Sequence, residues 1–475
     1  MSIASQVLLP GFVGTTLPDW LAERLRSGLA GVCVFGANIV SRAQLRRLTD
    51  DIREANPNAL IAIDEEGGDV TRLYQAVGSP YPGNALLGRI DDIEYTAAIA
   101  SVVGWQLRLA GCNLNFAPDV DINSNPNNPV IGVRSFGADP ALVARHSGAW
   151  IRGIESTGTA ASAKHFPGHG DTAQDSHLAL PVVDFPLAVL RNRELLPFEA
   201  AIAAGSRTIM TSHVLLPQVD PSCPATFSRA ILQGLLRKDL GFQGVIVSDA
   251  LDMKGASGDV GIAEAAVLAL AAGCDLLCIG TDNTEEQLNQ IDSAIVTAID
   301  DGRLGADRLA EAVARNALLG RELRADAASI PIPEYVTADY EPEFDLARTM
   351  VAFDVQPAVT LSTDRVLVIV EAGANIAVGT SPWGPAAAGV NLLRVVDGQT
   401  VDLPSGPQIV IIGRDNHRHA WVRAFIEGVR TSHPSVLVVD MGWPSDDRRY
   451  ADIATFGASR HVGQALLAWF EREQR

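Results

Sequence analysis

The chain has almost no lysine: of its 37 basic residues, 34 are arginines. The three lysines are Lys164, Lys238 and Lys254. A genomic composition bias explains most of this deficit, but it makes a lysine inside a motif worth examining. Cysteine is also scarce, with five residues and no CxxC pair, and three of them lie in apolar runs. We therefore expect buried thiols in a reducing cytosol and neither disulfides nor a cysteine metal site.

Membrane spans and targeting signals are missing as well. No apolar run reaches the ~20 residues that cross a bilayer, and the first 20 residues lack the basic and apolar regions of a secretion signal. A cytoplasmic location is expected. The formal net charge of -19 disfavours nucleic acid and membrane surfaces as partners, because both are anionic. A neutral small substrate fits this charge better.

Eight short apolar runs of β type alternate with longer helical stretches between residues 1 and 320. They lie at 7–12, 31–36, 60–66, 112–121, 159–166, 208–215, 244–251 and 274–280. Strands that are apolar along their whole length belong to a parallel sheet buried on both faces. The pattern predicts a (β/α)₈ TIM-like barrel at 1–325, with its active site where the strands end.

A proline-rich, acidic stretch at 326–345 is typical of a linker. Beyond it, buried-type strands at 365–371, 408–413 and 435–442 are accompanied by helical patterns at 417–431 and 459–471. Residues 346–475 are therefore expected to form a smaller three-layer α/β/α domain.

Ionisable residues stand at the ends of five predicted barrel strands. These residues are Asp64, Asp121, Lys164, His165, His213 and Asp249. Burying an unpaired charge in a barrel interior is very costly, so the set indicates a polar pocket on one face. Any one of them taken singly could equally cap a helix or pair with an arginine.

The densest motif is KHFPGHGDTAQDSH at 164–177, which starts at a strand end and continues into a loop. Asp175 and His177 are two residues apart, so an extended chain places both side chains on one side. A carboxylate beside an imidazole suits a general acid/base. A metal site built from this loop is the weaker alternative, because the loop has no HExxH-type helical register. It would use His165, His169, Asp171, Asp175 and His177. A Schiff-base Lys164 is also weaker, because the adjacent loop favours hydrogen bonding to hydroxyls.

The motif VSDALDM places Asp249 at the end of a buried strand. A carboxylate in this position can attack an anomeric carbon if a second group protonates the leaving oxygen. Taken alone the signal is weak, since aspartates often cap helices. Together with the histidine loop it indicates a two-group retaining mechanism.

The motifs IDEEGGDVTRL, NFAPDVDIN, GVRSFGADP, KHFPGHGDTAQDSH and VSDALDM, in this order, resemble the bacterial β-N-acetylglucosaminidase branch of glycoside hydrolase family 3. The resemblance covers most of residues 1–320. It implies a TIM-like barrel with Asp249 as nucleophile, His177 as acid/base and Asp175 as its partner. It also implies sugar binding by Asp64, Arg72, Arg134, Lys164, His165 and His213. From its strand-end position Asp121 is expected to bind substrate as well, and we expect neither a metal nor a cofactor, because the loop histidines and aspartates suit acid/base and hydroxyl contacts.

The chain departs from the branch at DEEGGDV, where the branch commonly has DQEGGRV. Glu65 and Asp69 thus predict a more acidic pocket rim. The expected activity is exo-hydrolysis of terminal β-linked N-acetylglucosamine from small glycans through a glycosyl-enzyme. Phosphorolysis, a mixed β-glucosidase activity and a non-catalytic sugar-binding barrel are the alternatives. The natural aglycone (chitobiose, muropeptide or protein-linked sugar) and the oligomeric state are left open by the sequence.

Overall fold

The computed structural model describes residues 3–174, 180–258, 260–373 and 377–473. The chain forms two compact units. The first comprises Met1–Glu65, Ile93–Ile122 and Asp139–Tyr340. The second comprises Glu66–Asp92, Asn123–Ala138 and Glu341–Arg475. Two segments of the predicted barrel region, 66–92 and 123–138, thus group with the C-terminal part of the chain.

The first unit contains a strand at each of the eight predicted places. They are β1 (Leu8–Leu9), β2 (Gly31–Val34), β3 (Leu60–Ile63), β4 (Leu114–Asn115), β5 (Ala160–Phe166), β6 (Thr208–Thr211), β7 (Val245–Val247) and β8 (Leu277–Cys278). Strands β2 to β7 form one parallel sheet, and β1 pairs with β8. Backbone hydrogen bonds from Cys33 to Pro10 and from Ser248 to Leu276, both 2.9 Å, connect these two sheets into a ring.

The interior of this ring is filled with side chains. One hydrophobic cluster takes a buried residue from every strand: Leu9, Cys33, Ala62, Leu114, Ala160, Met210, Val247 and Cys278. The predicted TIM-like α/β fold is confirmed, and two of the cysteines lie in this core as expected. Since a filled barrel leaves no room for polar groups inside, these can gather only where the strands end.

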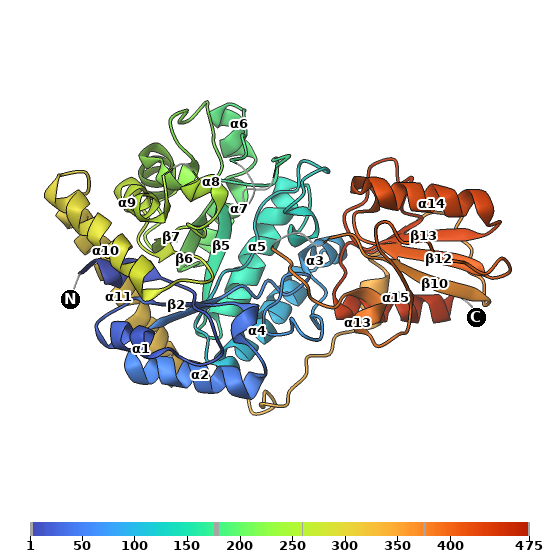
Figure 1. Cartoon of the computed structure of the whole chain (residues 1–475), viewed down its shortest axis with the longest axis horizontal. Coiled ribbons are helices and arrows are strands. Elements are labelled where there is room, and N and C mark those ends of the chain that lie inside the picture. The colour runs from blue at the N-terminus through green and yellow to red at the C-terminus, as the bar shows by residue number, and fades with distance from the viewer. Residues whose placement is uncertain (1–2, 175–179, 259, 374–376, 474–475) are drawn as a thin grey trace. The chain divides into compact units, whose positions relative to one another are not determined.

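Helices alternate with the strands and surround them (Figure 1). The longer ones are α1 (Asp19–Arg26), α2 (Arg42–Ala55), α4 (Ile93–Ala110), α5 (Pro140–Glu155), α7 (Leu196–Ala203), α9 (Ile262–Ala272), α10 (Glu285–Asp300) and α11 (Ala306–Ser329). Local sequence fixes several starts: Asp139 accepts a 2.7 Å hydrogen bond from the Leu142 amide, and Pro140 occupies the first helical position.

The second unit is built on a six-stranded sheet in the order β11 (Leu393–Val395), β10 (Arg365–Val370), β12 (Gln408–Gly413), β13 (Val436–Asp440), β14 (Ile453–Ala454) and β9 (Asp354–Val355). Only the β14–β9 pair is antiparallel. Helix α14 (Ala420–Ser432) packs on one face and α15 (Arg460–Arg472) on the other (Figure 1).

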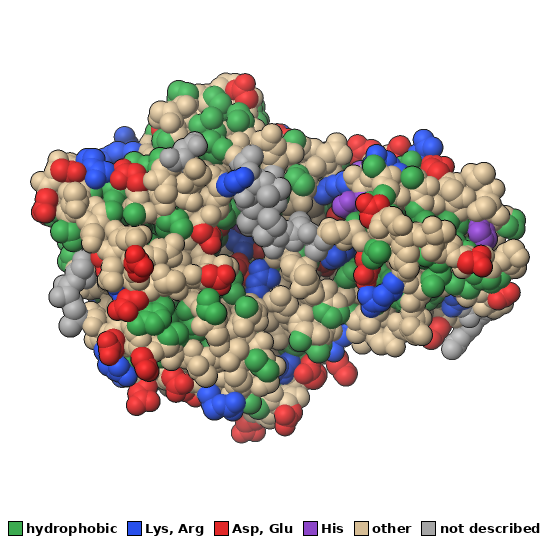
Figure 2. Space-filling view, viewed as in Figure 1, with side chains coloured by type: hydrophobic (Ala, Val, Ile, Leu, Met, Phe, Trp, Pro, Cys, Tyr) green, Lys and Arg blue, Asp and Glu red, His purple; other side chains and the backbone are tan. Residues whose placement is uncertain are grey.

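None of the described helices combines the length and the apolar character that a membrane span requires. On the face that Figure 2 shows, acidic and arginine side chains are scattered among polar ones and do not gather into a patch of one sign.

Candidate active site

The six predicted strand-end residues all belong to the first unit and lie at or beyond the carboxyl ends of β3 to β7. Asp64 follows β3 directly, and Lys164 and His165 lie within the last residues of β5. His213 and Asp249 each come two residues after their strands, β6 and β7. Parallel strands of a barrel end on one face, so the topology gathers these groups there.

Lys164 and Asp64 form an ion pair, with 2.8 Å between Nζ and Oδ1. The Lys164 side chain is 3% exposed and that of Asp64 is 17% exposed. A buried ammonium needs such a partner to remain charged. The pair connects the ends of β3 and β5 across β4, and it offers both donors and acceptors, which is the combination that recognises hydroxyl groups.

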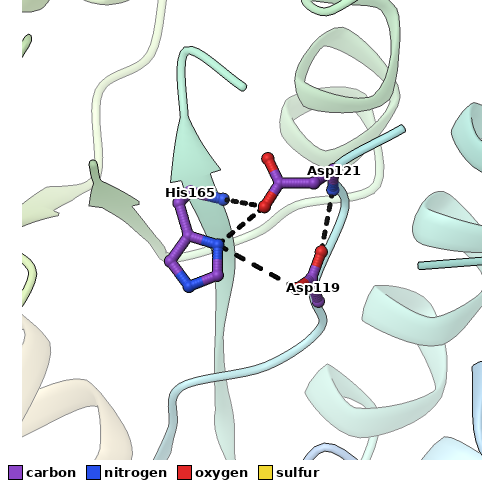
Figure 3. A group of neighbouring side chains, drawn as sticks. All are labelled: Asp119, Asp121 and His165. Atoms are coloured by element: carbon purple, nitrogen blue, oxygen red, sulfur yellow. Dashed lines mark hydrogen bonds and ion pairs between the residues drawn. The ribbon is translucent and has the colours of Figure 1, made fainter. Parts of the chain in front are cut away.

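Asp121 anchors the end of β5 and the loop after it (Figure 3). Its Oδ2 lies 2.7 Å from His165 Nδ1, and its Oδ1 accepts a 2.6 Å bond from the His169 amide. A carboxylate only accepts, so Nδ1 of His165 carries the proton. Asp121 is 1% exposed. These contacts position His165, and the prediction that Asp121 binds substrate stays a prediction.

Asp119 completes this cluster. Its Oδ1 accepts a 3.0 Å hydrogen bond from the Asp121 amide, and its Oδ2 lies 4.0 Å from His165 Nδ1. The three side chains could offer ligand atoms to a cation, because these atoms lie within 4.8 Å of one another. Hydrogen bonds already engage the carboxylates of Asp119 and Asp121 and the imidazole of His165. The predicted absence of a metal stays a prediction.

The loop after β5 is built around His169 and two glycines. Gly168 has a φ of +132°, and a Cβ on Gly170 would lie 1.7 Å from the Ile122 carbonyl oxygen, so each position requires glycine. His169 Nδ1 lies 2.8 Å from Thr172 Oγ1. Burial lowers the pKa of His169 to about 4, so its imidazole is neutral near pH 7. Asp175 and His177, the predicted acid/base pair, lie outside the described residues.

A carboxyl group that sequence reasoning missed lies beneath this loop. Glu194 is 2% exposed and receives a 2.6 Å bond from Arg193 Nε, while Arg193 Nη2 contacts Asp171 at 2.6 Å. Burial raises the pKa of Glu194 to about 7, although Arg193 opposes the shift. In the sequence, Glu194 is only an acidic residue shortly before a helix, and nothing there indicates that it is buried.

Asp249 and His213 are linked through the backbone. Asp249 Oδ1 accepts a 2.8 Å hydrogen bond from the Ala250 amide, and its side chain is half-buried. His213 Nε2 lies 3.0 Å from the Ala250 carbonyl oxygen, so this nitrogen carries the proton. His213 is fully buried, and its Nδ1 lies 2.9 Å from Thr226 Oγ1. These contacts hold the chain beside Asp249, and the prediction that His213 binds sugar stays a prediction.

The two predicted arginines belong to the second unit. Arg134 pairs with Glu66 through two parallel hydrogen bonds of 2.9 and 2.8 Å, and both side chains are buried. Arg72 donates to the Ala377 carbonyl oxygen at 3.0 Å. The sequence analysis did not single out Glu66, although this residue ends the acidic IDEE run at 63–66. The prediction that Glu65 makes the pocket rim more acidic is wrong, because Glu65 is fully buried.

A filled eight-stranded α/β barrel whose strand ends carry carboxylates, an ammonium and imidazoles has the design of a barrel enzyme. The family model described as "Glycosyl hydrolase family 3 N terminal domain" matches residues 15–319. The chain belongs to glycoside hydrolase family 3 and is a glycoside hydrolase.

Similar proteins cover different shares of the chain. Beta-hexosaminidase A of Pseudoalteromonas piscicida is 37% identical over 345 residues. The match covers 67% of this chain and 58% of the length of that relative. A beta-hexosaminidase of Stenotrophomonas maltophilia is 36% identical over 321 residues, 64% of this chain and 94% of its own length. A family 3 β-N-acetylglucosaminidase structure from Paenibacillus sp. str. FPU-7 has a TM-score of 0.85 at 30% identity, covering 99% of this chain and 96% of that one.

Proposed function

We propose that the chain is a retaining exo-β-N-acetylhexosaminidase that removes terminal β-linked N-acetylglucosamine from the non-reducing end of small glycans. The observation that carries the proposal is the half-buried Asp249 carboxylate, which is held at the end of β7 by the Ala250 amide. The names of the similar proteins support the sugar specificity.

In the proposed first step, an Asp249 oxygen attacks the anomeric carbon as the bond to the aglycone oxygen breaks. His177 donates a proton to that leaving oxygen, and Asp175 stabilises the protonated imidazole that carries this proton. In the second step His177 takes a proton from water, the water oxygen attacks the anomeric carbon, and Asp249 leaves. Two inversions at one carbon give net retention.

The described residues supply binding and positioning. Asp64 and Lys164 form a neutral pair that can accept from and donate to sugar hydroxyls. His165 is aimed by Asp121, and His213 fixes the backbone beside the nucleophile. Arg134, oriented by Glu66, and Arg72 are proposed as further sugar ligands. We propose that 1–325, 326–345 and 346–475 are the catalytic, linker and C-terminal parts along the sequence, with 66–92 and 123–138 of the catalytic part packing in the second unit.

The test is paired kinetics on p-nitrophenyl N-acetyl-β-glucosaminide and p-nitrophenyl β-glucoside, each with and without phosphate. The proposal expects a much larger kcat/KM for the N-acetylated substrate, a rate independent of phosphate, and free N-acetylglucosamine of β configuration as first product by NMR. A preference for the glucoside, or N-acetylglucosamine 1-phosphate as product, would overturn it.

A further inference from the structure

The sheet of the second unit reverses its strand order between β10 and β12. The chain passes from β10 to β11 on one side and then to β12 on the other. At such a point the two connections leave in opposite directions, and a crevice opens beyond the carboxyl ends of the strands. A cavity of about 230 Å³ lies there, lined by Ala372 and Gly373 after β10 and by Arg414 and Asp415 after β12.

Arg414 brings a partly desolvated cation to this cavity. Its guanidinium carbon lies 4.5 Å from the centre of the Trp383 ring, and burial lowers the pKa of the group. Among the residues that the structure describes, it forms no hydrogen bond and no ion pair within 4.0 Å. A guanidinium stacked on an aromatic ring, with its donors not engaged by a carboxylate, is suited to bind an oxyanion through two parallel hydrogen bonds.

Two carboxylates line the same cavity, and backbone amides already donate to both, those of Ala458 and Ser459 to Asp69. Asp69 Oδ1 accepts a 2.8 Å bond from the Ala458 amide, and Asp415 Oδ1 accepts a 3.0 Å bond from the Trp443 amide. Each retains lone pairs that hydroxyl groups could use. Arg418 pairs with Asp415 at 3.8 Å, whereas the Arg414 donors are left for a ligand, so the lining suits a molecule with hydroxyls and one negative group.

The loop that carries Arg414 is rigidly held. Asp440, at the end of β13, accepts hydrogen bonds of 2.8, 3.0 and 2.8 Å from the amides of Asp415, Asn416 and Gly442. A Cβ on Gly442 would lie 2.5 Å from the Asp415 nitrogen, so the two loops pack backbone against backbone. A site fixed in this way binds without first ordering its own chain.

We propose that this cavity is a binding site for a small sugar or polyol bearing a carboxylate or a phosphate, with Arg414 on the oxyanion and Asp69 and Asp415 on hydroxyl groups. All the residues that line this cavity belong to the second unit. Arg134, proposed above as a sugar ligand, is among them, but the present proposal assigns it no contact and does not rest on the proposed hydrolysis.

The experiment is isothermal titration of the full chain with glucuronate, glucose 6-phosphate and glucose. We expect at least one anionic sugar to bind at least tenfold more tightly than glucose, and the better of the two identifies carboxylate or phosphate as the recognised group. Arg414→Gln should weaken that binding at least tenfold. The matched control is Arg449→Gln, because Arg449 is exposed and pairs with Glu427; it should bind as the parent does.

Arg414→Lys keeps the charge but loses the paired donors, so it should bind with intermediate affinity and serves if Arg414→Gln does not fold. Circular dichroism melting checks the fold of each variant. The proposal is overturned if neither anionic sugar binds more tightly than glucose, or if folded Arg414 variants bind as well as the parent. Because binding is measured without turnover, failure here leaves the proposed hydrolysis untouched.

Discussion

The carboxylate of Asp249 is held in a way that suits a nucleophile. One oxygen accepts the Ala250 amide, and the half-buried side chain can still be approached by substrate. His213 contacts the carbonyl oxygen of Ala250, which holds the peptide that follows the one whose amide contacts Asp249. If Asp249 is the nucleophile, as proposed, His213 is a buried residue that helps to position it.

Replacing Asp249 by alanine should remove nearly all turnover of aryl N-acetyl-β-glucosaminides while the protein stays folded. The reason is that no glycosyl-enzyme can form without the attacking oxygen. Steady-state rates and melting curves measure the two effects, with Asp300→Asn, an exposed carboxylate of α10, as the control that keeps full rate. Retention of more than a few per cent of activity, or labelling of another residue by a fluoro-sugar reagent, would refute the assignment.

Replacing His177 by alanine should cost far more activity on chitobiose than on an activated aryl glycoside. General acid assistance contributes roughly 10² to 10⁴ in rate and matters most for a basic leaving oxygen. A phenolate leaves with little protonation, so the variant should accumulate glycosyl-enzyme and show a burst. Asp175→Ala should follow the same pattern more mildly. Equal losses on both substrates without a burst would show that His177 only binds sugar.

At the scale of elements, continuous apolar runs predicted every barrel strand and the strands β10, β12 and β13. Strands β9, β11 and β14 were missed, because none of them lies in a long continuous apolar run of the sequence. The strand-end residues were found because charge at the end of an apolar run is conspicuous. Asp119 and Glu194 were missed because their roles depend on neighbours distant in sequence, His165 and the loop around Gly168.

Glu194, which lies beside the loop after β5 and just before α7, should make the protein less stable as the pH rises. Its folded pKa of about 7 exceeds the ordinary 4.5, so the folded state holds the proton more tightly than the unfolded chain. The stabilisation is therefore complete below pH 4.5 and is lost as the pH rises through 7, by up to about 3 kcal/mol. Glu194→Gln stays neutral and should escape this loss.

Urea unfolding at pH 5 and pH 8 measures the effect. The stability gained by Glu194→Gln over the parent should be larger at pH 8 than at pH 5. Glu199→Gln, an exposed residue of α7, is the control and should show the same difference from the parent at both values. A pH-independent effect of Glu194→Gln would contradict the raised pKa.

At the scale of the whole molecule, the linear order of the sequence does not match the compact units. Segments 66–92 and 123–138 leave the barrel sequence and join the C-terminal sheet. Local periodicity predicts elements but carries no information on which distant partner an element packs against. Helix α3 (Asn84–Ile90) illustrates this, because nothing in its short apolar sequence shows that Leu86 packs with the C-terminal sheet.

Leu86 of α3 gives the test of this interleaving. It is fully buried in the cluster that contains Ile453, Val462 and Leu466 of the second unit. Leu86→Ala removes buried methyl groups and should destabilise the second unit by about 2 to 5 kcal/mol, although residue 86 lies in the barrel part of the sequence. Amide hydrogen exchange should therefore rise in β12, β13 and α15. Leu318→Ala, at a half-exposed position of α11, is the matched control and should leave exchange there unchanged. If Leu86→Ala accelerated exchange in β2 to β4 and left β12, β13 and α15 protected, Leu86 would belong energetically to the barrel, and the linear domain division would be the correct one.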